Sequence, residues 1–259
     1  MVIQDLVFEE FGTTGNPPLV ILHGFLASSR NWRQIAKQLS SRFHVYVPDQ
    51  RNHGASPHDP IMDYPAMADD LSAFLDAQGL GSAILLGHSM GGKVAMWFAL
   101  NHPERVSRLI VVDIAPVVYS HNFDTILSAM QRLPLSELNN RKQADDLLME
   151  AIPEQSFRQF LLQNLILTSG QYQWRIDVDV FRRTGPNIVG FPDAGLLPPF
   201  PDEALFIAGA KSSYVTEGDI KPLFPEASLK TVADAGHWLH VERPAAFIRL
   251  VDAFCADEG

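Results

Sequence analysis

Short, continuous apolar runs alternate along the chain with segments whose apolar residues recur at helical spacing. The runs lie at residues 19–22, 43–47, 82–86, 108–113, 204–208 and 229–232. Helical spacing predicts helices over 28–40, 64–78, about 90–101 and 244–255, and residues 2–11 predict an opening strand or hairpin. Continuous apolar strands separated by helices are typical of a parallel sheet covered on both faces, an α/β fold. Ligands of such sheets bind beyond the carboxyl ends of the strands.

The pattern changes between about Pro116 and Pro199. No strand run stands out there, and apolar residues recur at helical spacing around 123–130, 146–152, 157–165 and 178–183. The sequence therefore predicts a core domain made of 1–115 and 200–259, interrupted by a helical cap at 116–199.

Composition and charge narrow the range of partners. With 259 residues, 46% of them hydrophobic, the chain can bury a large core without disulfides or metals. The formal net charge of -10 and the lack of a Lys/Arg cluster argue against nucleic acid and anionic membrane as partners, which leaves small molecules.

Signals for the cell exterior or for a membrane are weak. Cys255 is the only cysteine, so no internal disulfide can form. Residues 1–11 carry acids and no long apolar core, unlike a signal peptide, and no 18-residue apolar stretch could span a bilayer. We expect a cytoplasmic protein without membrane insertion.

The hexapeptide G-H-S-M-G-G at residues 87–92 joins an apolar run to a predicted helix. A serine on such a sharp turn is exposed above the strand end and needs neighbours two positions away without side chains, which Gly87 and Gly91 provide. The motif arises by chance in roughly one chain in ten of this length, so its strand-to-helix context carries the prediction. Ser89 is the predicted nucleophile.

A serine hydroxyl needs a base to take its proton, and His237 is the best-placed histidine. It follows the last predicted strand in a loop opened by Gly236, which brings it to the same sheet edge as Ser89. His240 is the alternative base.

The acid that orients the imidazole is less obvious. In this topology it commonly follows the strand after the insertion, where residues 208–213 offer Ser212 instead of an aspartate. Asp113 ends the preceding strand at the correct edge and is our prediction. Glu217, Asp219 and Asp234 remain alternatives.

Two backbone amides are expected to hold the oxyanion, those of Phe25 and Met90. The Met90 amide opens a helix, whose dipole favours negative charge. His23 and His88 are interpreted as structural histidines. No histidine pair has zinc-ligand spacing with a glutamate partner, so no metal is expected.

Apolar residues of the predicted cap would cover the catalytic edge. Phe123, Met130, Phe160, Leu161 and Trp174 are candidates to line an acyl pocket. The same residues would serve equally as the core of the cap.

These motifs, in this order, resemble the α/β-hydrolase superfamily over nearly the whole chain. The resemblance is carried by H-G-F at 23–25, D-Q-R-N-H-G-A-S at 49–56, the hexapeptide, and G-H-W-L-H-V-E-R-P at 236–244. Ser212 together with Asp113 is similar to a bacterial esterase branch related to mitochondrial abhydrolase-domain proteins, in which the acid comes from the earlier strand. The resemblance implies a mostly parallel eight-stranded sheet with a helical cap, no cofactor, and ester or thioester hydrolysis through an acyl-enzyme.

The favoured function is therefore a serine hydrolase for short- to medium-chain carboxylic esters or thioesters, acyl-CoA included. A carbon–carbon hydrolase or lyase of the same fold is an alternative, and would need Arg51, Arg182 or Arg183 to face a carboxylated substrate. A ligand receptor on a hydrolase scaffold is another.

Overall fold

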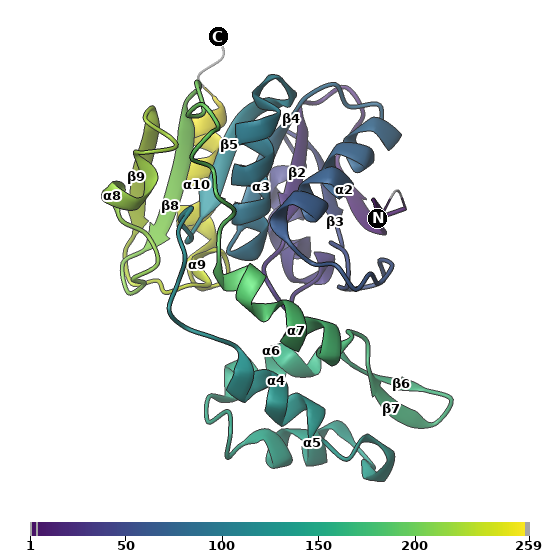
Figure 1. Ribbon diagram of the computed structural model, residues 1–259. Helices are drawn as coiled ribbons and strands as arrows, with labels where there is room; N and C mark the ends of the chain where they lie inside the picture. Colours follow the sequence, from purple (N-terminus) through teal and green to yellow (C-terminus); the bar gives the residue numbers. More distant parts are fainter. Residues whose placement is uncertain (1, 4, 257–259) are drawn as a thin grey trace.

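The computed structural model describes residues 2–3 and 5–256, and a single seven-stranded sheet forms its centre (Figure 1). The strand order is β1-β3-β2-β4-β5-β8-β9, with β1 antiparallel to β3 and all other pairs parallel. The strands are β1 (Phe8–Phe11), β2 (Pro18–Leu22), β3 (His44–Pro48), β4 (Ala83–His88), β5 (Val106–Val112), β8 (Ala204–Gly209) and β9 (Ala227–Val232).

The expectation of an eight-stranded sheet was wrong. The sheet has seven strands in the described part of the chain. The opening segment supplies only β1. Before β1, the Ile3 amide donates to Asp70 on a helix, and the Val7 carbonyl accepts from the Asp49 amide in a loop. These contacts hold Ile3 and Val7 beside the sheet, and neither residue is part of a strand.

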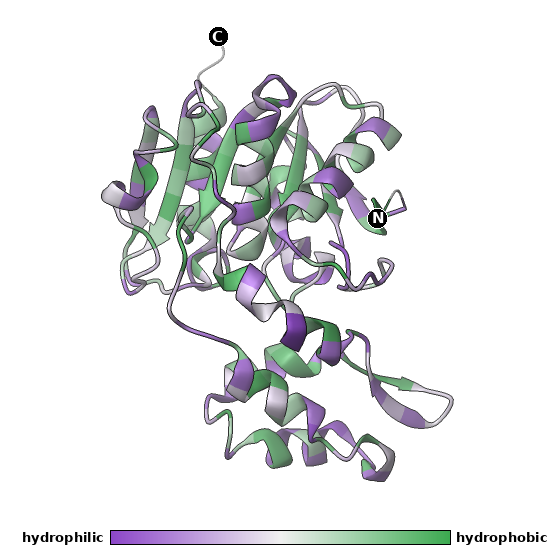
Figure 2. Ribbon diagram, viewed as in Figure 1, coloured by the Kyte–Doolittle hydropathy of each residue, from purple (hydrophilic) through white to green (hydrophobic). Residues whose placement is uncertain are grey.

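Helices cover both faces of the sheet, as the apolar runs predict. Successive strand residues point to opposite faces, so Val20 and Leu22 pack in the core layer under α2 and α3, while Leu19 and Ile21 pack in the layer under α1 and α10. Figure 2 shows the strands as mainly hydrophobic along their length. The covering helices are α1 (Arg33–Leu39), α2 (Tyr64–Ala77), α3 (Met90–Asn101) and α10 (Pro244–Cys255).

Short helical segments complete the core domain and lie in its connecting loops. These are η1 (Ser29–Trp32), η2 (Pro103–Arg105), α8 (Glu217–Ile220) and α9 (Leu239–Glu242).

The segment between β5 and β8 forms a cap on one side of the core (Figure 1). Its helices approximate the predicted ones with shifted ends. The cap elements are α4 (Asp124–Gln131), η3 (Leu135–Glu137), α5 (Arg141–Leu148), α6 (Gln155–Leu162), β6 (Leu165–Thr168), β7 (Gln171–Trp174) and α7 (Val178–Val189).

The β6–β7 hairpin corrects the expectation of a wholly helical cap. Its turn residues Ser169 and Gly170 both have positive φ, 51° and 81°. Positive φ at both central positions is the geometry of tight hairpin turns whose twist matches the flanking strands. The Ser-Gly dipeptide was the sequence signal for this turn.

Candidate active site

Ser89 lies on the sharp turn between β4 and α3, with φ 52° and ψ -120°. The backbone strain falls on the serine itself, while the two flanking glycines allow close approach. A Cβ on Gly87 would collide with the carbonyl oxygen of Gly91, and a Cβ on Gly91 would collide with that of Leu22. A side chain at Gly87 would push β4 away from the start of α3, and one at Gly91 would push α3 away from the end of β2.

His237 and Asp113 are brought together from β9 and β5, 124 residues apart. The ring Nδ1 donates to Asp113 Oδ2 at 2.8 Å, and Asp113 is fully buried. Because Nδ1 holds its proton toward the carboxylate, Nε2 is the nitrogen free to accept one.

Two further donors hold the Asp113 carboxylate. The Gly209 amide donates to Oδ1 at 2.9 Å, and the Ser212 hydroxyl donates to Oδ2 at 2.5 Å. Ser212 thus occupies the position where an aspartate is common, and its hydroxyl binds Asp113 at the end of β5. Sequence reasoning noted Ser212 only as a missing acid.

Ser89 and His237 line the same cavity. In the described part of the chain no hydrogen bond joins the Ser89 hydroxyl to the ring, and bonds of this kind are often long until substrate binds. Both side chains are partly exposed to the cavity. Both groups are therefore open to a molecule that enters the cavity.

The amides of Phe25 and Met90 lie beside Ser89 in the chain fold. Met90 opens α3, and Phe25 lies in the loop after β2. Within the described residues neither amide hydrogen has a protein acceptor. The loop that carries Phe25 is fixed at the following residue, because the Leu26 amide donates to His53 Nε2 at 3.1 Å.

His88 and His23 are buried and form hydrogen bonds beside Ser89. His88 Nε2 donates to the His237 carbonyl at 2.9 Å, and burial lowers the pKa of His88 well below its usual range. His23 donates from Nδ1 to the Gly24 carbonyl and accepts from the Gln50 amide, and burial lowers its pKa also. Both are therefore neutral and structural in this conformation, as the sequence indicated.

His240, the alternative base, stacks on Trp32 with ring centroids 4.2 Å apart. Burial lowers the pKa of His240 to about 3, and no partner holds its Nδ1 in the described structure. It therefore lacks the carboxylate that His237 has.

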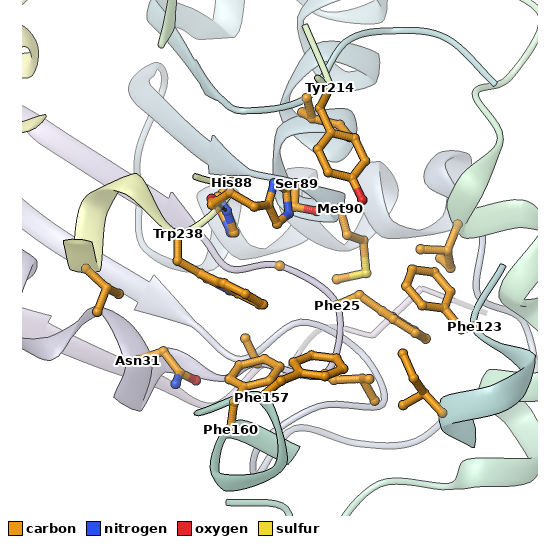
Figure 3. A pocket seen from close by; sticks show the side chains of 18 of the residues that line it. Phe25, Asn31, His88, Ser89, Met90, Phe123, Phe157, Phe160, Tyr214 and Trp238 are labelled. Carbon is orange, nitrogen blue, oxygen red and sulfur yellow. Dashed lines mark hydrogen bonds between the residues drawn. The ribbon is translucent and has the colours of Figure 1, made fainter. Parts of the chain in front are cut away.

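The cavity in front of Ser89 has a volume of about 640 Å³ and is lined mainly by aromatic and aliphatic side chains (Figure 3). Of the predicted pocket residues, Phe123 and Phe160 line it. Met130, Leu161 and Trp174 do not, which is a correction. Met130 and Leu161 are fully buried, and the Trp174 indole donates to the Met130 carbonyl. Helical spacing marks apolar positions, but it does not say which ones face a cavity and which ones face the cap interior.

Sequence reasoning missed several lining residues. Phe157 stacks near Phe160 with centroids 5.9 Å apart, and Trp238 lies 5.8 Å from Phe157. The Tyr214 ring lies 4.6 Å from His237. Two signals in the sequence could have found them. Trp238 directly follows His237, and Phe157 lies three residues before Phe160, so both phenylalanines share one helix face.

Comparison with known proteins decides the family. A family model described as the alpha/beta hydrolase fold matches residues 17–244. The chain belongs to the α/β hydrolases. The predicted fold, a mostly parallel sheet flanked by helices, is thereby confirmed.

Individual relatives of this α/β hydrolase are esterases and lipases. It is 40% identical to sn-1-specific diacylglycerol lipase ABHD11 of Danio rerio, over 96% of this chain and 82% of that one. It is 37% identical to esterase YbfF of Escherichia coli strain K12, over 93% and 94%. A solved marine microorganism esterase superposes with TM-score 0.93 at 41% identity, covering 96% and 99%. The chain is therefore an esterase- or lipase-type hydrolase, as predicted.

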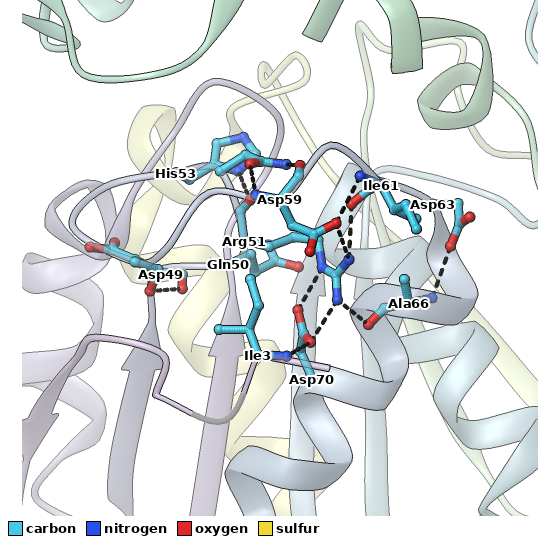
Figure 4. Close-up of polar contacts among 12 residues, drawn as sticks. Ile3, Asp49, Gln50, Arg51, His53, Asp59, Ile61, Asp63, Ala66 and Asp70 are labelled. Carbon is cyan, nitrogen blue, oxygen red and sulfur yellow. Dashed lines mark hydrogen bonds and ion pairs between the residues drawn. The ribbon is translucent and has the colours of Figure 1, made fainter. Parts of the chain in front are cut away.

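The arginines that a carboxylated substrate would need lie elsewhere in this hydrolase. Arg51 forms a buried ion pair with Asp70, Nε to Oδ2 at 2.6 Å, and also donates to two backbone carbonyls (Figure 4). Arg182 donates to Gln131 on the cap surface, and Arg183 is exposed. Among the described residues, no arginine lines the cavity.

Metal-binding clusters and membrane-spanning helices are both absent from the described residues. In residues 2–3 and 5–256, no three His, Cys, Asp or Glu side chains gather as a candidate metal site. No helix in that part of the chain has the length and apolar character needed to cross a bilayer.

Proposed function

We propose that the hydrolase cleaves short- to medium-chain carboxylic esters or thioesters through an acyl-enzyme on Ser89. The observation that carries the proposal is the 2.8 Å hydrogen bond from His237 to buried Asp113, with His237 and Ser89 lining one apolar cavity. A serine, an oriented imidazole and a buried carboxylate are the groups that acyl transfer needs.

Acylation begins when the Ser89 oxygen attacks the substrate carbonyl carbon while His237 Nε2 takes the hydroxyl proton. The amides of Phe25 and Met90 donate to the negative oxygen of the tetrahedral intermediate. The carbon–oxygen or carbon–sulfur bond then breaks, and His237 returns the proton to the leaving alcohol or thiol. Asp113 stabilises the imidazolium in both steps.

Deacylation repeats the sequence with water. His237 takes a proton from the water molecule, which attacks the acyl carbon, and the proton then returns to Ser89 as the acid leaves. The fixed Nδ1 tautomer serves both half-reactions.

The cavity favours an apolar acyl group over a charged one. Phe123, Phe157 and Phe160 give the chain an apolar surface, and the relatives include a diacylglycerol lipase and an esterase. A thioester such as an acyl-CoA is cleaved by the same steps, because a thiolate is an easier leaving group than an alkoxide.

Ser89→Ala tests the nucleophile. We expect turnover of p-nitrophenyl esters to fall about 10⁴-fold or more. Ser41→Ala is the matched control, because its hydroxyl is exposed and only bonds the Gln38 carbonyl. Unchanged turnover in Ser89→Ala would exclude the scheme, and the absence of fluorophosphonate labelling in the wild type would favour a receptor. A panel of acyl esters and acyl-CoAs of increasing length then ranks the substrates.

A further inference from the structure

Lys93 lies one helical turn after Ser89 on α3, and its side chain is buried against the cap connections. Nζ donates to the carbonyls of Val117 at 2.8 Å, Val189 at 3.0 Å and Gly190 at 2.5 Å. Val117 belongs to the segment that enters the cap, and Val189 and Gly190 to the segment that leaves it. One ammonium group therefore fastens both covalent connections of the cap to the nucleophile helix.

Neighbouring contacts join the same two segments. The Tyr119 amide donates to the Val189 carbonyl at 3.0 Å, and the Tyr64 hydroxyl of α2 donates to the Ile188 carbonyl at 2.6 Å. Lys93 Nζ also lies 4.6 Å from the centre of the Tyr119 ring, within the range of a cation–π contact. No carboxylate of the described residues pairs with Lys93, so its donors serve the backbone alone.

The cap has a second attachment across the cavity, in which side chains are the hydrogen-bond donors. Asn164 donates to the Leu26 carbonyl at 2.8 Å, and Asn31 donates to Gln163 at 2.8 Å. Such contacts can break and re-form, whereas the two connections cannot detach. The connections are therefore where a change in cap angle would be absorbed, as in other hinged domains.

We propose that Lys93 is a positioning residue that fixes the cap over Ser89 and so sets how long an acyl chain the site binds productively. This rests on the proposed function. Ser89, Phe25 and Met90 come from the core, while Phe123, Phe157 and Phe160 come from the cap. An acetyl group needs the core side alone, but a longer chain needs both sides at the correct separation.

The charge state of Lys93 adds a pH dependence. Three carbonyls use three N–H donors, which only the ammonium form has. Burial lowers the pKa of Lys93 to about 7, so loss of a proton removes one of the three bonds in the neutral range.

The titratable groups that face Lys93 are Tyr64 from α2 and Tyr119 and His121 from the entering segment; the leaving segment 188–190 carries none. Burial raises the pKa of both tyrosines, and burial followed by the Lys93 charge lowers the pKa of His121. All three are therefore uncharged where Lys93 titrates.

Lys93→Met, which keeps an unbranched chain without donors, tests the proposal. We expect the ratio of kcat/KM for p-nitrophenyl octanoate to that for the acetate to fall about tenfold, mainly through KM for octanoate. Lys142→Met is the matched control, because Lys142 pairs only with Asp146 on the exposed surface of the cap. It should leave the ratio unchanged.

The same ratio reports on pH. In the wild type it should decline as pH rises through about 7, and in Lys93→Met it should be flat. Any pH effect that the two esters share cancels in the ratio.

Two results would overturn the proposal: an equal loss for both esters, which would mean general support of the fold, or a wild-type pH slope retained in Lys93→Met. If Lys93→Met does not fold, Tyr64→Phe removes one bond to the same segment and should lower the ratio by about two- to threefold.

Hydrogen exchange gives a readout independent of turnover. Peptides covering 113–121 and 186–192 should exchange faster in Lys93→Met than in Lys142→Met. Equal rates would refute the proposal that Lys93 fixes these two segments. If Ser89→Ala retains activity, the proposed function fails. Hydrogen exchange still tests the role of Lys93 in that case, because it does not depend on turnover.

Discussion

At the scale of single residues, the candidate site depends on what surrounds each reactive group. Ser89 has an ordinary side chain, but its backbone conformation is one that few non-glycine residues adopt. Asp113 also has a positive φ of 53°, which turns its carboxylate from the end of β5 toward His237. Strain of this kind persists where surrounding contacts over-determine it, and Asp113 has three donors.

Asp113→Asn should preserve the fold and lower kcat on the order of 10⁴-fold, because the amide can donate to Nδ1 and select the wrong tautomer. Steady-state kinetics with p-nitrophenyl butyrate measures the loss. Asp234→Asn is the control, since that side chain is 73% exposed and near only Lys211. Near-normal rates in Asp113→Asn would transfer the role to Glu217 or Asp219.

At the scale of elements, a buried ion pair fixes the loop after β3 against α2. Arg51 and Asp70 contact each other through two hydrogen bonds of 2.6 and 2.7 Å, and Arg51 also donates to the Ile61 and Ala66 carbonyls. This arrangement is shown in Figure 4. The motif at 49–56 is therefore a framework for the active-site loops, in which Asp49 accepts from the Ser29 and Ala55 amides.

Asp70→Ala should destabilise the protein by about 3–5 kcal/mol, because it removes the carboxylate that lies closest to the buried Arg51 charge, at 2.6 Å, whereas Asp59 lies 3.8 Å away. Urea unfolding measures this, and kcat on short esters should stay close to wild type where the protein is folded. Asp146→Ala removes an exposed i, i+4 partner of Lys142 and should cost only about 0.5 kcal/mol. Equal effects of the two changes would contradict the assignment.

At the scale of the whole molecule, the hydrolase is a rigid core with a cap on two backbone connections. The core carries the proposed nucleophile, base, acid and oxyanion amides, and aromatic side chains of the cap line the cavity. In the proposed scheme the core therefore performs the chemistry, and the cap limits the size of the substrate. The buried Lys93 joins them, and a buried charge has a cost in folding free energy.

The pH dependence of stability follows from Lys93. Its pKa falls from 10.5 when unfolded to about 7 when folded, so between these values the unfolded state binds more protons. Stability of the wild type relative to Lys93→Met should therefore rise with pH from 7 to 10.5, by a few kcal/mol at about 1.4 kcal/mol for each pKa unit. Urea unfolding of both proteins across this range checks the sign. A difference that is constant with pH would show that Lys93 does not titrate there.

Local signals in the sequence determined most of the core. The apolar runs predicted the parallel strands, the hexapeptide predicted the turn at Ser89, and edge placement predicted that His237 and Asp113 would be close. These predictions succeed because periodicity and turn chemistry are local, and because parallel strands bring their carboxyl ends to one edge. The roles of these residues in catalysis remain predictions until the variants are measured.

Tertiary structure alone decided what depends on direction and on contacts distant in the chain. It turned Phe160 to the cavity and Leu161 to the cap interior, gave Ser212 to Asp113, and placed Lys93 between two segments 72 residues apart. Neighbouring apolar residues look alike in a sequence, and a side-chain donor selects its acceptor only once the backbone has folded around it. The sequence determined which chemical groups reach the sheet edge, and packing determined which of them face the substrate.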